Sequence, residues 1–87
     1  MPVVWIPSLL RDLTGGQETV TVSGETVRQV IEHLDEQYPG VKERLLEGDA
    51  LRPGIAVFVD GTLSRQRLRH TLAEDSEVHF LPALSGG

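Results

Sequence analysis

The feature that most constrains the fold is a single amphipathic helix in the first half of the chain. Five apolar residues recur there at helical spacing and therefore share one face: Val27, Val30, Ile31, Leu34 and Tyr38. Thr26 precedes them with Gln29 three residues later, a capping-box pattern that satisfies backbone donors at a helix start. Pro39-Gly40 ends the pattern. In a chain of 87 residues, this apolar stripe must be buried against the remaining segments.

The segments before this helix have β character. Residues 3–6 form a short β-rich run closed by Pro7. Residues 19–22 alternate polar and apolar side chains, which predicts a half-buried strand. These two runs could pair as a wide hairpin, with a helical turn over residues 8–13 between them.

The segments after the helix complete the predicted sheet. Residues 55–59 are continuously apolar, which predicts a strand buried on both faces. Asp60-Gly61 follows at once and predicts a type I′ hairpin turn. Residues 62–68 should return as an edge strand or extended loop, and residues 78–81 should form the last strand.

Two further segments, residues 41–47 and 48–54, are predicted to be a short helix and a loop. The element order then predicts an α+β fold, in which one main helix packs on a mixed sheet of about five strands. No repeat or linker divides the chain, so we expect one domain over residues 1–83 and a flexible tail over residues 84–87.

Composition excludes several function classes. The chain has no cysteine, which rules out disulfides, thiolate metal sites and cysteine nucleophiles, and we find no metal-ligand pattern. Its formal net charge of −5 argues against nucleic-acid binding, and no window approaches a membrane span. We expect a soluble, cytoplasmic protein.

A local basic run stands out in this acidic chain: Arg65, Arg67, Arg69 and His70. One interpretation is a solvated strand edge or loop, since surface charge commonly serves solubility. The other is a docking contact for an acidic partner. The sequence leaves both open.

The end of the chain is Gly86-Gly87, which follows an apolar run. Because glycine has no side chain and a wide conformational range, such a tail could enter a narrow channel and present its terminal carboxylate to another protein. A frayed terminus is the alternative, because small residues are common at chain ends.

An ordered set of motifs runs the length of the chain: Ile6-Pro7-Ser8-Leu9-Leu10-Arg11, Thr14-Gly15-Gly16-Gln17, Thr26-Val27, Tyr38-Pro39-Gly40, Glu43-Arg44-Leu45, Val57-Phe58-Val59, and Leu81-Pro82-Ala83 ahead of Gly86-Gly87. Together these motifs resemble the small sulfur carriers of the β-grasp, or ubiquitin-like, fold. This family includes the small subunit of molybdopterin synthase, the thiamine-biosynthesis sulfur carrier and the sulfur carriers of a cysteine-biosynthesis route.

The early segment and the Pro-Ala tail look most like the cysteine-route carriers. Two positions depart from the family pattern. Glu74-Asp75-Ser76 stands where relatives place Asp-Gly-Asp, and Ser85 stands where the nearest relatives have Ala. Asp is well suited to a turn and Ser is small, so we expect the fold and the tail chemistry to be kept.

The resemblance implies that this protein is a co-substrate and not an enzyme. In the family, an E1-like activating enzyme uses Mg-ATP to adenylate the terminal carboxylate, here that of Gly87 after Gly86. A sulfur donor then displaces AMP and leaves a thiocarboxylate. The second partner would be a sulfur-accepting synthase, for which a pyridoxal-phosphate-dependent enzyme is one option, and the chain itself would bind no cofactor, nucleic acid or membrane.

The partner surface should surround the tail, with Phe58, Leu81, Pro82, Leu84, Ser85 and Arg11 as its candidates. Core packing is the alternative for Phe58, because its run is apolar. Leu81 should point away from Phe80 and be either exposed or covered by another element. Arg11 is carried over from the family's early segment.

Four functions remain after this reasoning. The first is sulfur donation to a biosynthetic enzyme, for which cysteine or a related sulfur metabolite is the favoured product. The second is a ubiquitin-like modifier, conjugated to lysines through Gly87. The third is a passive interaction module, and the fourth is the small subunit of molybdopterin synthase.

Overall fold

The computed structural model of the chain describes residues 1–82. The predicted helix is α1 (Val27–Gln37), and its N-terminus has the expected cap. Thr26 Oγ1 accepts a hydrogen bond from the backbone N–H of Gln29 at 3.2 Å, and Gln29 Oε1 accepts one from the N–H of Glu25 at 2.8 Å. Val27, Val30, Ile31 and Leu34 of the predicted stripe are fully buried, which confirms the helix prediction, whereas Tyr38 caps the end of the helix and is half-buried.

A five-stranded sheet packs on this helix in the order β2-β1-β7-β5-β6. Its strands are β1 (Val3–Trp5), β2 (Thr19–Thr21), β5 (Ile55–Val59), β6 (Thr62–Leu63) and β7 (Glu77–Pro82). The central pair β1 and β7 is parallel and the other pairs are antiparallel, so the sheet is mixed, as predicted. Val4 lies opposite Val20, which confirms the wide hairpin.

The segment after α1 differs in part from the prediction. The helix α2 (Val41–Leu45) ends two residues earlier than the predicted range, and a small hairpin of β3 (Leu46–Glu47) and β4 (Ala50–Leu51) follows it. The prediction of a loop over residues 48–54 was therefore wrong for Ala50 and Leu51, which form β4. Gly48, at φ +64°, allows the tight turn, and the buried side chains of Leu46 and Leu51 hold the hairpin to the core.

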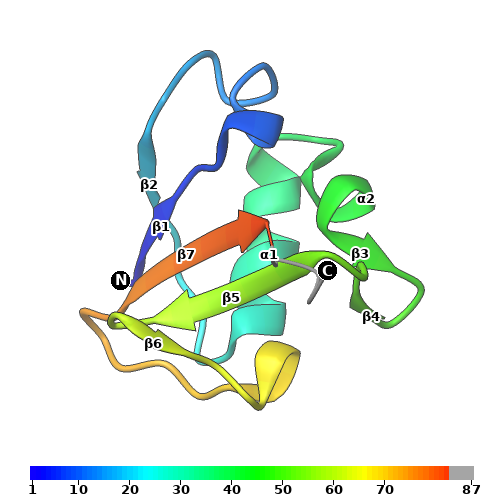
Figure 1. The fold of residues 1–87 in the computed structure, drawn as a ribbon. Coiled ribbons are helices and arrows are strands. Elements are labelled where there is room, and N and C mark those ends of the chain that lie inside the picture. The colour runs from blue at the N-terminus through cyan, green and yellow to red at the C-terminus, as the bar shows by residue number, and fades with distance from the viewer. Residues whose placement is uncertain (83–87) are drawn as a thin grey trace.

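The helices cover only one face of the sheet (Figure 1). Val57, Val78 and Phe80 point to the helix side and are buried. Ala56 and Phe58 alternate with them on the opposite face, which no element of residues 1–82 covers, and are only half-buried. The prediction that residues 55–59 are buried on both faces was therefore wrong. We refer to the uncovered side as the open face.

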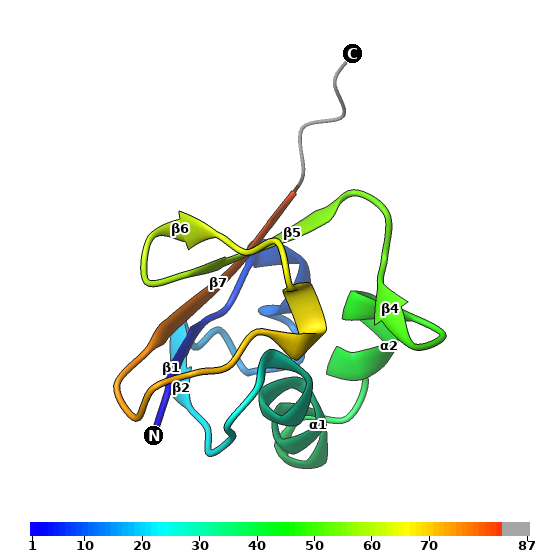
Figure 2. The same cartoon turned by 90° about the horizontal axis from the view of Figure 1, so that it is seen from below.

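The β5–β6 connection is the predicted tight turn, since Asp60 and Gly61 have φ of +52° and +84°. The edge strand β6 is short, and the chain then forms the 3₁₀ helix η2 (Arg67–Arg69), which buries Leu68. A second 3₁₀ helix, η1 (Ser8–Leu10), follows β1 in the predicted helical turn. Figure 2 shows the end of β7 beside the start of β5. In the described part of the chain no helix is long and apolar enough to cross a membrane.

Candidate functional site: the end of β7 and the open face

The predicted reactive residues Gly86 and Gly87 lie outside the described residues, as do Leu84 and Ser85 and the predicted domain boundary. What the structure describes is the surface from which the chain continues. That surface begins at Pro82, the last residue of β7, which is exposed and aligned with Ile55 of β5.

Leu81 lies on the open face beside this exit. Its side chain is 44% exposed, whereas the neighbouring Phe80 is only 1% exposed and points into the core. The prediction that the two side chains point in opposite directions is confirmed, and of its two outcomes for Leu81 the exposed one holds. An exposed leucine of this kind can serve as an apolar contact for a partner.

An aromatic and apolar row crosses the open face. Trp5, His79, Phe58 and Leu63 are aligned across β1, β7, β5 and β6. The rings of Trp5 and His79 stack with centroids 5.1 Å apart and an interplanar angle of 11°. Trp5 and Leu63 are 41% and 52% exposed, so this row leaves apolar surface in contact with solvent. We call these four residues the open-face row.

The core-packing alternative for Phe58 was wrong, because this residue is half-buried on the open face and lies outside the hydrophobic core. Its role as a partner contact stays a prediction. Trp5 and Leu63 were missed by the sequence reasoning. The signal for Trp5 was present, because it alternates with the apolar Val4 and Ile6 in a short strand and must point to the opposite face.

A groove of about 300 Å³ opens next to the end of β7, between that strand and the β1–η1 segment. Leu81 and Pro82 form one wall, and Leu9 and Arg11 lie among the residues of the other. Arg11 Nε donates a hydrogen bond to the carbonyl oxygen of Ile6 at 3.3 Å, which holds this side chain at the groove. The structure thus brings Arg11 next to Leu81 and Pro82, from which it is far apart in the sequence.

The groove wall at η1 is fixed by an ion pair from α2. Arg44 donates to both carboxylate oxygens of Asp12, at 2.6 and 3.1 Å, and to the carbonyl oxygen of Leu9 at 2.8 Å. The hydrogen bond from Arg44 lowers the pKa of the Asp12 carboxyl below its ordinary value. A bidentate contact of this kind sets the position of the segment that lines the groove.

No group of three His, Asp or Glu side chains within residues 1–82 is arranged to hold a metal ion. The described surface offers shape and apolar area for contact with a partner.

Comparison with known proteins relates this surface to a family. The sequence matches the model of the ThiS family over residues 4–87. It is 37% identical to the sulfur carrier protein CysO of Mycobacterium tuberculosis over 91 residues, which covers 97% of this chain and 96% of the relative.

Solved structures agree with the sequence comparison. A chain in the crystal structure of the Amycolatopsis orientalis BexX/CysO complex has a TM-score of 0.90 and 31% identity, with both chains covered completely. The small archaeal modifier protein SAMP1 of Methanosarcina acetivorans has a TM-score of 0.81 and 29% identity, covering 99% of this chain and 95% of that one. These likenesses confirm the predicted β-grasp fold and the predicted resemblance to sulfur carriers.

Proposed function

Because this chain belongs to the ThiS family, we propose that it carries sulfur as a thiocarboxylate on Gly87. The observation that carries the proposal is the likeness to the CysO sulfur carrier, which extends over 97% of the chain. The proposed carrier group needs no side chain, which suits a sequence without cysteine.

The proposed chemistry has two steps, both performed by a separate activating enzyme. A free carboxylate is a poor acyl donor, because oxide is a poor leaving group. A Gly87 carboxylate oxygen first attacks the α-phosphorus of ATP, which releases Mg-pyrophosphate and forms an acyl-adenylate. A sulfide-equivalent donor then attacks the acyl carbon and displaces AMP, leaving the thiocarboxylate. The chain takes part as a co-substrate, and we propose that this happens in the cytoplasm.

We further propose that the open face and the groove dock the domain while the tail enters the enzyme. Leu81, Pro82 and Phe58 would supply apolar contact, and Arg11 would supply a guanidinium at the rim of the groove. Leu84, Ser85 and Gly86 would occupy the channel that leads to the active site, for which small side chains are needed near Gly87.

The second partner would be an enzyme that accepts the sulfide, with a cysteine-forming or related synthase as the favoured class. The solved relative from Amycolatopsis orientalis is itself part of a complex with a second protein, BexX. This supports the view that a protein of this shape works by binding another protein.

Protein modification is a second candidate function. The observation in its favour is the likeness to SAMP1, whose name describes a modifier. An acyl-adenylate at Gly87 could also pass its acyl group to a lysine amine, with loss of AMP and a proton. Lys42 is the only lysine in this chain, which disfavours polymeric chains built on the protein itself and does not bear on the attachment of a single copy to a target.

The test is reconstitution with the activating enzyme of the same host. The purified chain, that enzyme and Mg-ATP should release one pyrophosphate per chain, and added sulfide should then give a thiocarboxylate. A variant lacking Gly87 is the control and should release none. Equal pyrophosphate release from both would refute activation at Gly87, whereas lysine adducts without a thiocarboxylate would favour the modifier.

A further inference from the structure

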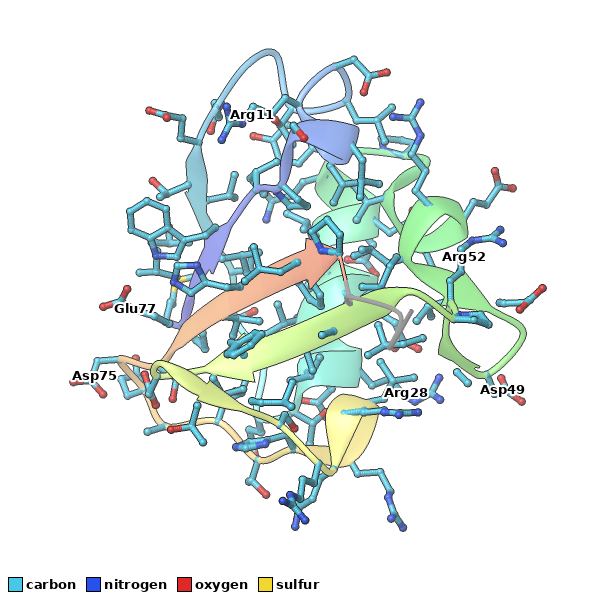
Figure 3. All side chains as sticks on the ribbon, in the orientation of Figure 1. Arg11, Arg28, Asp49, Arg52, Asp75 and Glu77 are labelled. Atoms are coloured by element: carbon cyan, nitrogen blue, oxygen red, sulfur yellow. The ribbon has the colours of Figure 1, made fainter. Side chains whose placement is uncertain are left out.

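Five of the eight Lys and Arg residues gather on one side of the domain. We call them the arginine rim: Arg28, Arg52, Arg65, Arg67 and Arg69. They line three adjoining hollows, and Arg67 contributes to all three. In Figure 3, Arg28 and Arg52 lie on the side where β5 begins, together with Asp49, whereas Asp75 and Glu77 lie at the opposite end of the sheet. Most of the positive charge of this acidic chain is therefore concentrated on one side of the domain.

None of the rim arginines forms an ion pair with a carboxylate of residues 1–82, although Asp49 lines one of the hollows with three of them. The side-chain ion pairs of this part of the chain are Arg44 with Asp12, Lys42 with Glu32 and the His79–Glu77 contact, all outside the rim. Arg28 and Arg52 instead donate to backbone carbonyl oxygens, those of Asp49 and Glu43. Such contacts fix the guanidinium groups and leave their charge available to a partner.

Arg67, at the centre of the rim, has an unfavourable backbone conformation. Its φ is +53°, a left-handed value at which a residue with a long side chain is strained. The backbone N–H of Arg67 donates to Ser64 Oγ at 2.9 Å, which helps to hold this conformation. Glycine or asparagine would fit the turn better. Folding alone therefore does not explain an arginine here, and strain of this kind points to a function for the side chain.

The rim adjoins the point where the chain leaves the sheet. Ile55 is aligned with Pro82 on the neighbouring strand, about 5 Å away. The same Ile55 lines two of the three hollows, together with Arg65 and Arg67 in one and with Arg52 and Arg67 in the other. The last described residue of β7 therefore lies close to the part of the rim that Arg52, Arg65 and Arg67 form.

We propose that the arginine rim docks on an acidic surface of the activating enzyme, beside the entrance that receives the tail. This deepens the proposed function and rests on it. Opposite charges would speed association and orient the domain with its tail towards that entrance. The activating enzyme is the chosen partner because adenylation is the first step that needs the tail. A nucleic acid is disfavoured as the occupant, since the rest of this acidic chain would repel it.

The test measures the association rate of the full chain with the host's activating enzyme by stopped flow, without ATP. Arg65→Glu changes an exposed rim residue, and Lys42→Glu is the matched control, with the same charge reversal on α2. At low salt, Arg65→Glu should associate about tenfold more slowly than the wild type, and Lys42→Glu should be close to it. The difference should vanish near 1 M salt, where screening acts within about 3 Å. Equal rates for Arg65→Glu and the wild type at low salt would overturn the proposal.

Arg67→Asn separates docking from folding. Asparagine tolerates a left-handed conformation, so the variant should keep or raise the melting temperature while it slows association. A lower melting temperature with unchanged association would show that Arg67 serves the fold and overturn its docking role. Total tRNA serves as a polyanion probe for the alternative occupant. If Arg65→Glu binds tRNA more weakly than the wild type but associates with the enzyme at the same rate, the rim belongs to a nucleic-acid site and the proposal is overturned.

This assay also distinguishes the inference from the function on which it rests. Pyrophosphate release is measured separately, in the presence of Mg-ATP. If Arg65→Glu slows association at low salt but the wild type releases no pyrophosphate, adenylation of Gly87 is refuted and the docking surface is kept. If the wild type releases pyrophosphate but Arg65→Glu associates at the wild-type rate, the docking surface is refuted and adenylation is kept.

Discussion

Replacing Leu81 with aspartate should weaken docking strongly and the fold only slightly. Full burial of a leucine side chain is worth about 1.5–3 kcal/mol, and Leu81 is still 44% exposed, so about 1 kcal/mol remains to be gained in a complex. Aspartate loses that gain and also places an unpaired polar group in the interface, which costs about 1–3 kcal/mol more. The total of about 3 kcal/mol corresponds to a loss of affinity of about 100-fold.

The assay is pyrophosphate release by the activating enzyme as a function of chain concentration. The loss should appear as a lower kcat/KM, with an unfolding free energy within about 1 kcal/mol of the wild type, because the position is exposed. Thr21→Asp is the control, since it places the same charge on the open face but at the opposite end of the sheet. Unchanged kcat/KM for Leu81→Asp would refute the docking role of this face.

Three other substitutions test the structural account. Asp12→Asn removes the ion pair with Arg44, whose hydrogen bond lowers the pKa of Asp12 in the folded state. The stability that this pair contributes should therefore be present at pH 7 and lost as the pH falls below about 4, so urea unfolding curves of variant and wild type should differ at pH 7 and converge in acid. A difference that persists in acid would contradict this assignment. Thr26→Ala should lower the unfolding free energy by about 1 kcal/mol through loss of the cap to Gln29, measured by the same method. Gly24→Ala should lower the melting temperature, because the new Cβ would lie 2.8 Å from Val30 Cγ2 and 3.0 Å from Val30 N; an unchanged value would mean that the loop yields.

The local signals in the sequence predicted the elements that depend on local physics. The cap of α1 and its apolar stripe need only neighbouring residues, and the structure has both. The turn at Asp60-Gly61 likewise follows from residues that tolerate positive φ. Thr19–Thr21 alternates clearly enough to predict its strand and its half-buried face.

The sequence failed where the outcome depends on distant parts of the chain. The β3–β4 hairpin has two residues per strand, too few for any periodicity, and it exists because Leu46 and Leu51 reach the core. Residues 55–59 are apolar on both faces, and only the arrangement of the helices reveals that one of those faces stays uncovered. Apolar residues on this uncovered face depart from the pattern of a core strand, and this departure is what the proposed docking role would require.

The candidate site was predictable only where its residues could be placed from local sequence. Leu81 and Pro82 could be placed from the strand that precedes the tail, and Arg11 from its motif. Their meeting in one groove depends on the parallel pairing of β1 with β7, which brings together segments more than 70 residues apart, such as Trp5 and His79. The arginine rim is a second case, because Arg28 and Arg52 join the basic run only in the folded chain.

The central claim is that Gly87 carries sulfur, and the intact mass of the protein purified from its own host tests it most directly. We predict a species in which one oxygen is replaced by sulfur, located in the C-terminal fragment and absent from a variant that lacks Gly87. If the host protein contains only the unmodified acid, even after incubation with the host's activating enzyme, Mg-ATP and sulfide, the carrier account is contradicted.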